Sequence, residues 1–243
     1  MKTCADSAFI RNDWQNIPLI DRPELLKPLT THRVARRFKP LTEQQPTQIL
    51  YPHEVLQGRR CAVNLAKYPC SKMYLETHRA HLESRQYVTK SGRKWYEIWV
   101  PQDPDAWHHP KLVFRDIVDV PTFWIDQSGS IVNGDCYWLI CTNSTQVDLL
   151  WLAAAVGNST FIEQFYDYCF NNKLYAGRRR YITQYVEKFP LPDPQAPLSK
   201  GIIAKAKQIY ECIPSNEAIR LQQELDDMVW KSFGLRIEES SRE

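Results

Sequence analysis

The hydrophobic pattern of this chain changes period near its middle, and this change constrains the fold more than any other feature. Apolar and aromatic residues first follow the short alternation of strands, in runs expected at residues 95–100, 111–117, 122–125 and 137–141. They then recur at helical spacing, in segments expected at residues 147–157, 159–170, 199–212 and 216–233. The pattern predicts an α+β fold, with a small antiparallel β-sheet flanked by helices and a C-terminal helical hairpin.

Capping residues indicate where several of these helices begin and end. Ser71 precedes an amphipathic run that continues to about residue 87. Thr145 is expected to cap the helix that Gly157 ends, and Ser159 to begin the next one. Gly234 terminates the last helix, and a strand-like piece is expected directly after residue 181. The chain therefore has a β block followed by paired helices.

Composition and the positions of proline and turn residues divide the chain into three predicted parts. Residues 1–50 are rich in proline and polar residues, which predicts an irregular N-terminal arm with one strand at 48–51. Residues 51–197 hold the strand-to-helix transition and form the predicted α+β domain. Residues 198–243 form the helical hairpin and a short polar tail.

Basic residues are clustered although the chain is only mildly basic. Lys and Arg number 31 against 28 Asp and Glu, a formal net charge of +3, so any electrostatic footprint must come from clusters. Such clusters occur at residues 33–39, 59–60, 93–94 and 178–180. A basic cluster is either a solvated face or a contact surface for nucleic acid, and the 33–39 stretch suits an acidic partner domain equally well.

Several functional classes lack their motifs in this sequence. The seven cysteines include no Cys-x-x-Cys pair, which argues against a zinc site or a disulfide scaffold. No glycine-rich phosphate loop or cofactor-binding glycine motif occurs, so no cofactor is expected in this chain. Free thiols, together with the lack of a signal-peptide pattern or a long apolar run, lead us to expect a cytoplasmic protein without a membrane contact.

One catalytic pattern occurs in approximate form. His109, Lys111 and Asp116 match the His-x-Lys-x4-Asp pattern of phospholipase-D-type phosphodiesterases, in which histidine is the nucleophile and lysine holds the phosphate. The downstream Gly-Ser-x-x-Asn element at 129–133 lies farther along the chain than that family places it, and a second copy of the motif would have to come from a dimer. A nuclease is therefore the weaker alternative.

Six pieces of the chain, in this order, resemble a known domain over about residues 51–235. They are the amphipathic helix at 74–85, Arg-Lys-Trp-Tyr-Glu-Ile at 93–98, Pro-Lys-Leu-Val-Phe-Arg-Asp-Ile at 110–117 with Pro-Thr-Phe at 121–123, Leu-Leu-Trp-Leu at 149–152 with Val-Gly-Asn-Ser at 156–159, Gly-Arg at 177–178 with Phe-Pro-Leu-Pro at 189–192, and Leu-Asp-Asp-Met-Val at 225–229 with Phe-Gly-Leu at 233–235. The domain that they resemble is the TaqI-like C-terminal specificity domain, the target-recognition domain of adenine-N6 DNA methyltransferases and of fused type IIG restriction-modification enzymes.

The resemblance implies a division of labour between two domains. In that family a separate catalytic domain binds S-adenosylmethionine and carries an Asn-Pro-Pro-Tyr-type tetrapeptide, which is absent here. The chain is therefore expected to read double-stranded DNA without being an enzyme on its own, beside a methyltransferase catalytic subunit that holds the cofactor. A protein-interaction module that has lost DNA reading is the alternative.

The resemblance and the positions of the cations together predict a DNA-facing set of residues. Arginine and lysine bind phosphates, whereas Arg, Asn and Gln also make bidentate contacts with base edges. The aromatic residues at 95–96, 123–124 and 137–138 are expected to pack in the core rather than to stack on bases. The predicted DNA-binding residues are Arg93, Lys94, Lys111, Arg115, Asn158, Lys173, Arg178, Arg179, Arg180 and Tyr181.

Overall fold

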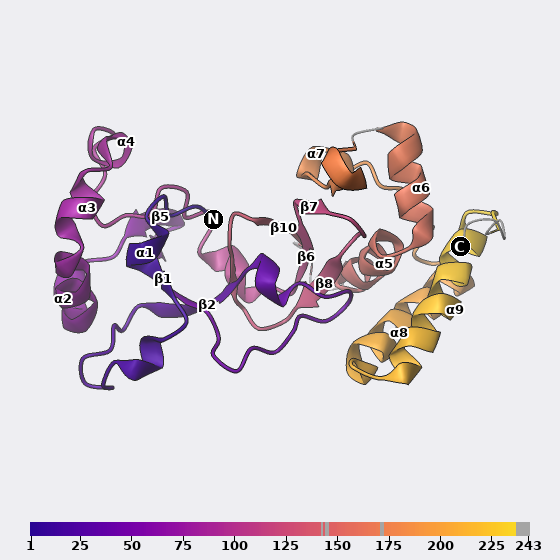
Figure 1. Ribbon diagram of the computed structural model, residues 1–243, viewed down its shortest axis with the longest axis horizontal. Coiled ribbons are helices and arrows are strands. Elements are labelled where there is room, and N and C mark those ends of the chain that lie inside the picture. Colours follow the sequence, from indigo (N-terminus) through magenta and orange to yellow (C-terminus); the bar gives the residue numbers. More distant parts are fainter. Residues whose placement is uncertain (142, 144–145, 171–172, 237–243) are drawn as a thin grey trace. The chain divides into compact units, whose positions relative to one another are not determined.

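The computed structural model describes residues 1–141, 143, 146–170 and 173–236 (Figure 1). Its contacts divide the chain into two compact units, each assembled from segments that are separated in sequence. Unit 1 consists of Met1–Thr31, Thr42–His108 and Ser128–Gly134, and unit 2 of His32–Leu41, His109–Gln127 and Asp135–Glu243. The three-part division expected from the sequence stays a prediction.

Unit 1 contains a four-stranded sheet of short strands, in the order β1-β3-β2-β9. These strands are β1 (Ile10–Arg11), β2 (Leu26–Thr30), β3 (Gln48–Leu50) and β9 (Ile131–Val132). Strand β3 is antiparallel to both of its neighbours, whereas β2 and β9 are parallel. Strand β3 confirms the strand expected at 48–51, but β1 and β2 also lie in residues 1–50 and were not expected. Two residues in β1, and a run interrupted by Pro28 in β2, leave no periodicity to be detected.

The rest of unit 1 is a hairpin and a series of short helices. Strands β4 (His53–Leu56) and β5 (Arg59–Ala62) pair across a turn in which Gln57 and Gly58 both have positive φ. The helical elements are α1 (Asp6–Phe9), η1 (Trp14–Asn16), η3 (Leu65–Lys67), α2 (Pro69–Thr77), α3 (Arg79–Glu83), α4 (Gln86–Thr89) and η4 (Asp105–His108).

The single helix expected at 71–87 is instead three short helices. The chain leaves the helical path at His78, whose φ and ψ are −103° and 5°. Ser71 is not the capping residue, because the carboxylate of Glu24 accepts hydrogen bonds from the backbone N–H groups of Cys70 and Ser71 at 3.0 and 2.8 Å. A residue distant in sequence thus performs the capping expected of a local side chain.

The strand expected at residues 95–100 is wrong for a definable reason. The Arg93 guanidinium donates to the carbonyl oxygens of Ile98 and Trp99, and the Arg85 guanidinium donates to that of Trp95. Among the described residues, the only β-bridge of this segment is an isolated antiparallel one between Val100 and Lys2. Arginine side chains thus take the acceptors that a neighbouring strand would need.

Unit 2 contains the antiparallel sheet that the alternating pattern predicted. Its strands are β6 (Lys111–Arg115), β8 (Phe123–Asp126) and β10 (Cys136–Ile140), in the order β10-β6-β8. A second, two-stranded sheet pairs β7 (Ile117–Val118) with β11 (Arg179–Arg180). The rings of Phe114 and Phe123 stack at 5.0 Å in the core. Burial also confirms the core expectation for Tyr96, Phe123 and Trp124, whereas the rings at 95, 137 and 138 are half-buried.

Helices make up most of the remainder of unit 2. They are η2 (His32–Val34), α5 (Asp148–Gly157), α6 (Thr160–Cys169), η6 (Tyr175–Gly177), α7 (Thr183–Val186), α8 (Pro197–Cys212) and α9 (Asn216–Ser232). Ser159 caps α6 as predicted, because its hydroxyl accepts from the N–H of Ile162. The predicted cap at Thr145 lies outside the described residues. Helix α7 replaces the strand-like piece expected after residue 181.

Helices α8 and α9 pack side by side as the predicted C-terminal hairpin, and α5 packs on both α8 and β8 (Figure 1). Gly157 permits the close approach of α5 to the sheet, since a Cβ there would lie 2.9 Å from the Phe123 ring. These contacts confirm the α+β fold class. In the part of the chain that the structure describes, no helix is long and apolar enough to cross a membrane.

Candidate nucleic-acid interface

The basic run at 178–180 lies on a hairpin formed by Lys173 to Arg180, which we call the basic hairpin. Its arms are joined by an isolated antiparallel bridge between Lys173 and Arg179, and the Leu174 N–H donates to the Arg178 carbonyl at 2.7 Å. Strand β11, the second arm, pairs with β7 through Arg179 with Val118 and Arg180 with Ile117. The hairpin is therefore attached to the end of the segment that continues from β6.

Each arginine of the run has its own acidic partner. Arg178 pairs with Asp119 at 3.0 Å, and Arg180 with Asp116 at 3.0 Å. Arg179 makes a bidentate pair with Asp167 on α6, with N–O distances of 2.7 and 2.8 Å. The run is therefore held by acidic side chains from two different parts of unit 2.

Arg179 differs from its two neighbours in its burial. Its side chain is 13% exposed and also contacts Glu163 at 3.4 Å, whereas the side chains of Arg178 and Arg180 are 43% and 47% exposed. The bonds from Arg179 hold the pKa of Asp167 below its usual range, and burial raises the pKa of Glu163. Arg179 is thus a structural cation that fastens the hairpin to α6.

The pairing nearly cancels the charge of the basic hairpin. Its four cations, Lys173 and the three arginines, meet four carboxylates, those of Asp116, Asp119, Glu163 and Asp167. Exposed pairs of this kind contribute about 0–1 kcal/mol each, so Arg178 and Arg180 can exchange their carboxylates for phosphates at little cost. The less exposed, bidentate pair of Arg179 cannot do so as readily.

Arg115 is the remaining predicted cation at this end of unit 2. It is the last residue of β6 and is half-buried. Its backbone belongs to the β6–β10 ladder, but its side chain makes no hydrogen bond or ion pair with any residue that the structure describes. Its guanidinium is therefore available to a ligand without breaking an internal bond.

Lys111 is not on a surface, which corrects its assignment to the DNA-facing set. Its side chain is fully buried, and its ammonium lies 3.5 Å from the Asp126 carboxylate, which is 2% exposed. The two residues are register partners across β6 and β8. Burial lowers the pKa of Lys111, and the nearby carboxylate opposes this shift. A lysine enclosed in this way does not reach a phosphate.

The same burial removes the basis for the phosphodiesterase alternative. His109 is exposed, Lys111 is enclosed with Asp126, and Asp116 is paired with Arg180. Lys111 begins β6 and Asp116 directly follows its last residue, which separates them by about 16 Å at ~3.3 Å per residue. Among the described residues, no group of three or more His, Cys, Asp and Glu side chains is arranged to hold a metal ion.

Asn158 and Tyr181 also have internal roles and are corrected with Lys111. The Asn158 amide accepts from the Phe123 N–H at 3.0 Å and donates to the Phe123 carbonyl at 2.8 Å. Tyr181 is fully buried, with its ring 4.8 Å from that of Tyr166, and burial raises its pKa. Both residues hold the sheet and helices of unit 2 together.

We expect Asn158→Ala to lower the free energy of unfolding by about 2–3 kcal/mol, because it leaves the buried Phe123 N–H without an acceptor. Urea unfolding followed by circular dichroism measures the change. Asn64→Ala is the control, since Asn64 is exposed and caps only η3, and it should cost ~1 kcal/mol or less. Full stability combined with a selective loss of DNA affinity would instead return Asn158 to the DNA-facing set.

The two predicted cations of unit 1 behave differently from each other. Arg93 is half-buried and bonds to Glu97 as well as to the two backbone carbonyls described above. Lys94 is exposed, with its ammonium 5.7 Å from the centre of the Tyr96 ring. Arg93 is therefore a structural cation, and DNA binding by Lys94 stays a prediction.

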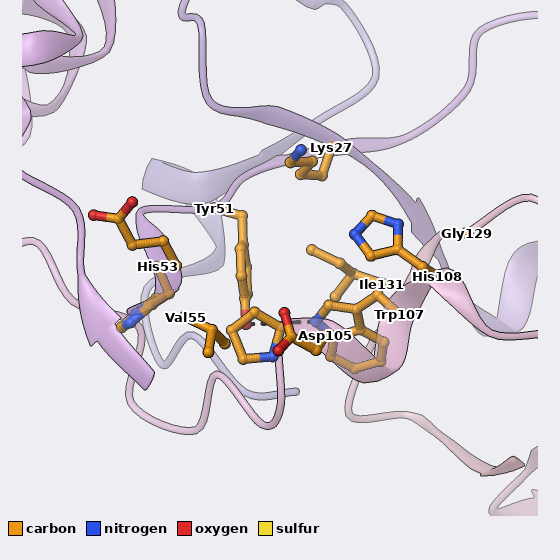
Figure 2. A pocket seen from close by; sticks show the side chains of 11 residues that line it. Lys27, Tyr51, His53, Val55, Asp105, Trp107, His108, Gly129 and Ile131 are labelled. Carbon is orange, nitrogen blue, oxygen red and sulfur yellow. Dashed lines mark hydrogen bonds between the residues drawn. The ribbon is translucent and has the colours of Figure 1, made fainter. Parts of the chain in front are cut away.

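Unit 1 also contains a pocket of about 220 Å³ with aromatic walls (Figure 2). The Trp107 indole N–H donates to the Tyr51 hydroxyl at 3.4 Å, and that hydroxyl donates to the Pro101 carbonyl at 2.7 Å. His53 in the wall accepts from the Ile98 N–H at 3.0 Å through Nε2. Burial lowers the pKa of His53 to about 3, assisted by Arg93 and Arg60, and raises that of Tyr51 to about 12. Both groups are therefore neutral at pH 7 and committed to internal bonds.

Sequence reasoning missed the acidic residues that decide which cations are available. Asp116 and Asp119 follow β6 closely, but they meet their arginines across 64 and 59 residues of sequence. It also missed Tyr175, a 75% exposed aromatic residue within the basic hairpin. Its position three residues before an arginine run was the one local signal that could have found it.

The chain is similar in sequence to known proteins over most of its length. A family model described as the TaqI-like C-terminal specificity domain matches residues 53–191. The chain is 39% identical over 238 residues to the Type II methyltransferase M.BanIII of Aneurinibacillus aneurinilyticus, an alignment that covers 97% of this chain and 41% of that protein. It is 24% identical over 173 residues to the Type II methyltransferase M.BstVI of Geobacillus stearothermophilus, covering 71% of this chain and 28% of that protein. The chain thus spans less than half the length of these curated relatives.

Proposed function

The chain belongs to the TaqI-like C-terminal specificity domain family, and from this premise we propose that it recognises a specific sequence in double-stranded DNA for an adenine-N6 DNA methyltransferase. The observation that carries the proposal is that the matched residues, 53–191, include Arg115 and the entire basic hairpin. Of these residues, Arg115 has no side-chain hydrogen-bond or ion-pair partner among the described residues, and Lys173, Arg178 and Arg180 have side chains 43–48% exposed. Lys173, Arg178 and Arg180 contact phosphates or bases in this proposal, and Arg179 positions them.

The proposal assigns catalysis to another part of the methyltransferase system. M.BanIII extends well beyond the segment that this chain matches, and we expect the catalytic domain and its S-adenosylmethionine to correspond to that remainder. A methylase must extrude its target base at a cost of a few kcal/mol, and a domain that grips the duplex supplies compensating contacts. This chain would then set the position of the complex on the DNA and select the target sequence, while the catalytic domain would transfer the methyl group.

The neutralised charge of the basic hairpin favours one rival function. A surface whose cations are already paired with carboxylates attracts DNA less than a free basic patch does. A protein-interaction module that retains the fold and has lost DNA reading fits that observation. Tight association with a methyltransferase chain in the absence of any DNA binding would support it.

We expect Arg178→Ala/Arg180→Ala to weaken DNA binding and to flatten its salt dependence. Removing one cation from a phosphate reduces the slope of log K against log salt concentration by about 0.9, so the double variant should reduce that slope by up to ~2. Fluorescence anisotropy with a mixed-sequence 30-bp duplex, from 50 to 200 mM salt, measures both quantities. Arg179 is left intact because its removal would loosen the hairpin.

Arg220→Ala provides the matched control for this double variant. Arg220 is also an exposed arginine of unit 2 in an ion pair, with Glu224 at 2.5 Å, but it lies on α9. Its replacement should leave the slope unchanged. Equal slopes for the wild-type chain and the double variant would remove these two arginines from the interface.

A further inference from the structure

The tip of the basic hairpin is a tight backbone turn at Ala176 and Gly177. Ala176 and Gly177 both have left-handed φ values, 57° and 71°, and together reverse the chain tightly. A Cβ at Gly177 would meet no atom within 4 Å, so backbone conformation and not packing favours glycine there. A non-glycine residue held at positive φ, such as Ala176, costs about 1 kcal/mol or more, and such positions concentrate at functional sites.

The side chains at this tip are directed to solvent. Tyr175 is 75% exposed, and the Arg178 guanidinium lies 5.6 Å from the centre of its ring. Among the described residues Arg178 forms an ion pair only with Asp119, whose own side chain is 70% exposed, so this pair is readily replaced. A large aromatic ring left in water contributes little to folding, whereas Tyr and Arg dominate binding surfaces.

The base of the hairpin makes more bonds to the described residues than the tip does. Arg179 bonds to Asp167 and also donates to the Asp119 carbonyl at 3.0 Å. Lys173 pairs with the same Asp167 from the opposite arm at 2.9 Å. One carboxylate on α6, that of Asp167, thus binds both arms and fixes the position of the exposed tip relative to α6.

We propose that the tip of the basic hairpin, Tyr175 to Arg178, enters a groove of the DNA and reads base edges there. The inference rests on the proposed function and deepens it by naming the reading element. The major groove is ~12 Å wide and admits a two-stranded ribbon, and arginine makes bidentate contacts with guanine there. Arg178 exchanges Asp119 for a base edge, Tyr175 packs against the neighbouring base, and Arg179 acts as a positioning residue.

A selection experiment tests this proposal without knowledge of the target. The full chain is incubated with duplexes containing about 14 random base pairs, somewhat more than one helical turn, and the bound pool is sequenced. Wild-type protein should enrich a motif, and Tyr175→Ala and Arg178→Ala should each relax that motif at one or more positions. Affinity for the enriched duplex should fall about 5- to 150-fold, the equivalent of ~1–3 kcal/mol per base contact.

Controls separate the failure of this inference from the failure of the proposed function. Tyr168→Ala removes a tyrosine that is 92% exposed on α6, and it should enrich the wild-type motif. Tyr175→Ala removes no charge, so its salt slope should equal that of the wild type. An unchanged motif and affinity in both tip variants would overturn the tip as reader while leaving DNA recognition intact. A wild-type chain that enriches no motif would overturn the proposed function and this inference with it.

Discussion

Replacing Asp126 by leucine should lower the free energy of unfolding by about 3–5 kcal/mol, because it strands the buried Lys111 ammonium without its carboxylate. Burial already lowers the pKa of Lys111 in the wild-type protein, and Asp126 is the charge that opposes this effect. Without Asp126, Lys111 must lose its proton or draw water into the sheet. Urea unfolding at pH 7, followed by circular dichroism, measures the change.

The double variant Lys111→Met/Asp126→Leu is the decisive control. Replacing both members of a buried pair by apolar residues is often neutral or stabilising, so most of the stability should return. DNA affinity of the double variant should match that of the wild type, because Lys111 is enclosed and not part of the binding surface. A stable double variant that no longer binds DNA would contradict this placement, and an Asp126→Leu variant as stable as the wild type would contradict the burial of the pair.

Unit 1 should lose stability in mild acid mainly through His53, whose pKa is lowered much further than that of His78. The pKa of His53 is lowered to about 3 by burial and by Arg93 and Arg60, whereas an unfolded histidine titrates near 6.5. Below pH 6.5 His53 is therefore protonated in the unfolded chain but stays neutral in the folded chain, and the free energy of unfolding decreases as the pH falls toward 3. Between pH 7 and pH 4.5 the decrease due to His53 should be about 2–3 kcal/mol.

His53→Gln should remove most of this acid sensitivity. A glutamine oxygen can accept a hydrogen bond from the Ile98 N–H, as His53 does, but it does not titrate in this range. The measurement is the difference between urea midpoints at pH 7 and pH 4.5 in the two proteins. His109→Gln replaces an exposed histidine and should keep the wild-type pH dependence. Equal acid sensitivity of wild-type and His53→Gln proteins would show that other groups cause it.

The sequence predicted those helices and strands in which apolar residues form a clear helical or strand pattern. Strands β6, β8 and β10 are only 4 or 5 residues long, but each is an apolar and aromatic run next to turn residues, and helices α8 and α9 have 16 and 17 residues; all five lie close to where they were expected. In residues 1–50, β3 lies where a strand was expected, whereas β1 has only 2 residues and β2 contains Pro28 and does not alternate in burial; their sheet is completed by β9 from far along the chain. A run of 2 residues, or one interrupted by proline, shows no strand periodicity.

Sequence reasoning identified the cations of the candidate site but not their burial. The basic run was correctly identified as a cluster, but the sequence alone treated its arginines as equivalent. In the structure Arg179 is 13% exposed, while its neighbours are 43% and 47% exposed. Lys111 is a cation that is buried in the core, where its register partner on β8, Asp126, supplies the countercharge. Alternation along a strand does not reveal whether the opposite strand supplies a countercharge.

The sequence by itself determined the fold class, the C-terminal hairpin and the family, because periodicity and ordered motifs are properties of the chain alone. Tertiary structure decided which cations remain available. Arg180 meets Asp116 across 64 residues and Arg178 meets Asp119 across 59, and burial depends on whatever packs on the other side. Coulomb energy and desolvation depend on distance and enclosure in space. For that reason the tip of the basic hairpin, and not the whole basic run, became the candidate reader of DNA.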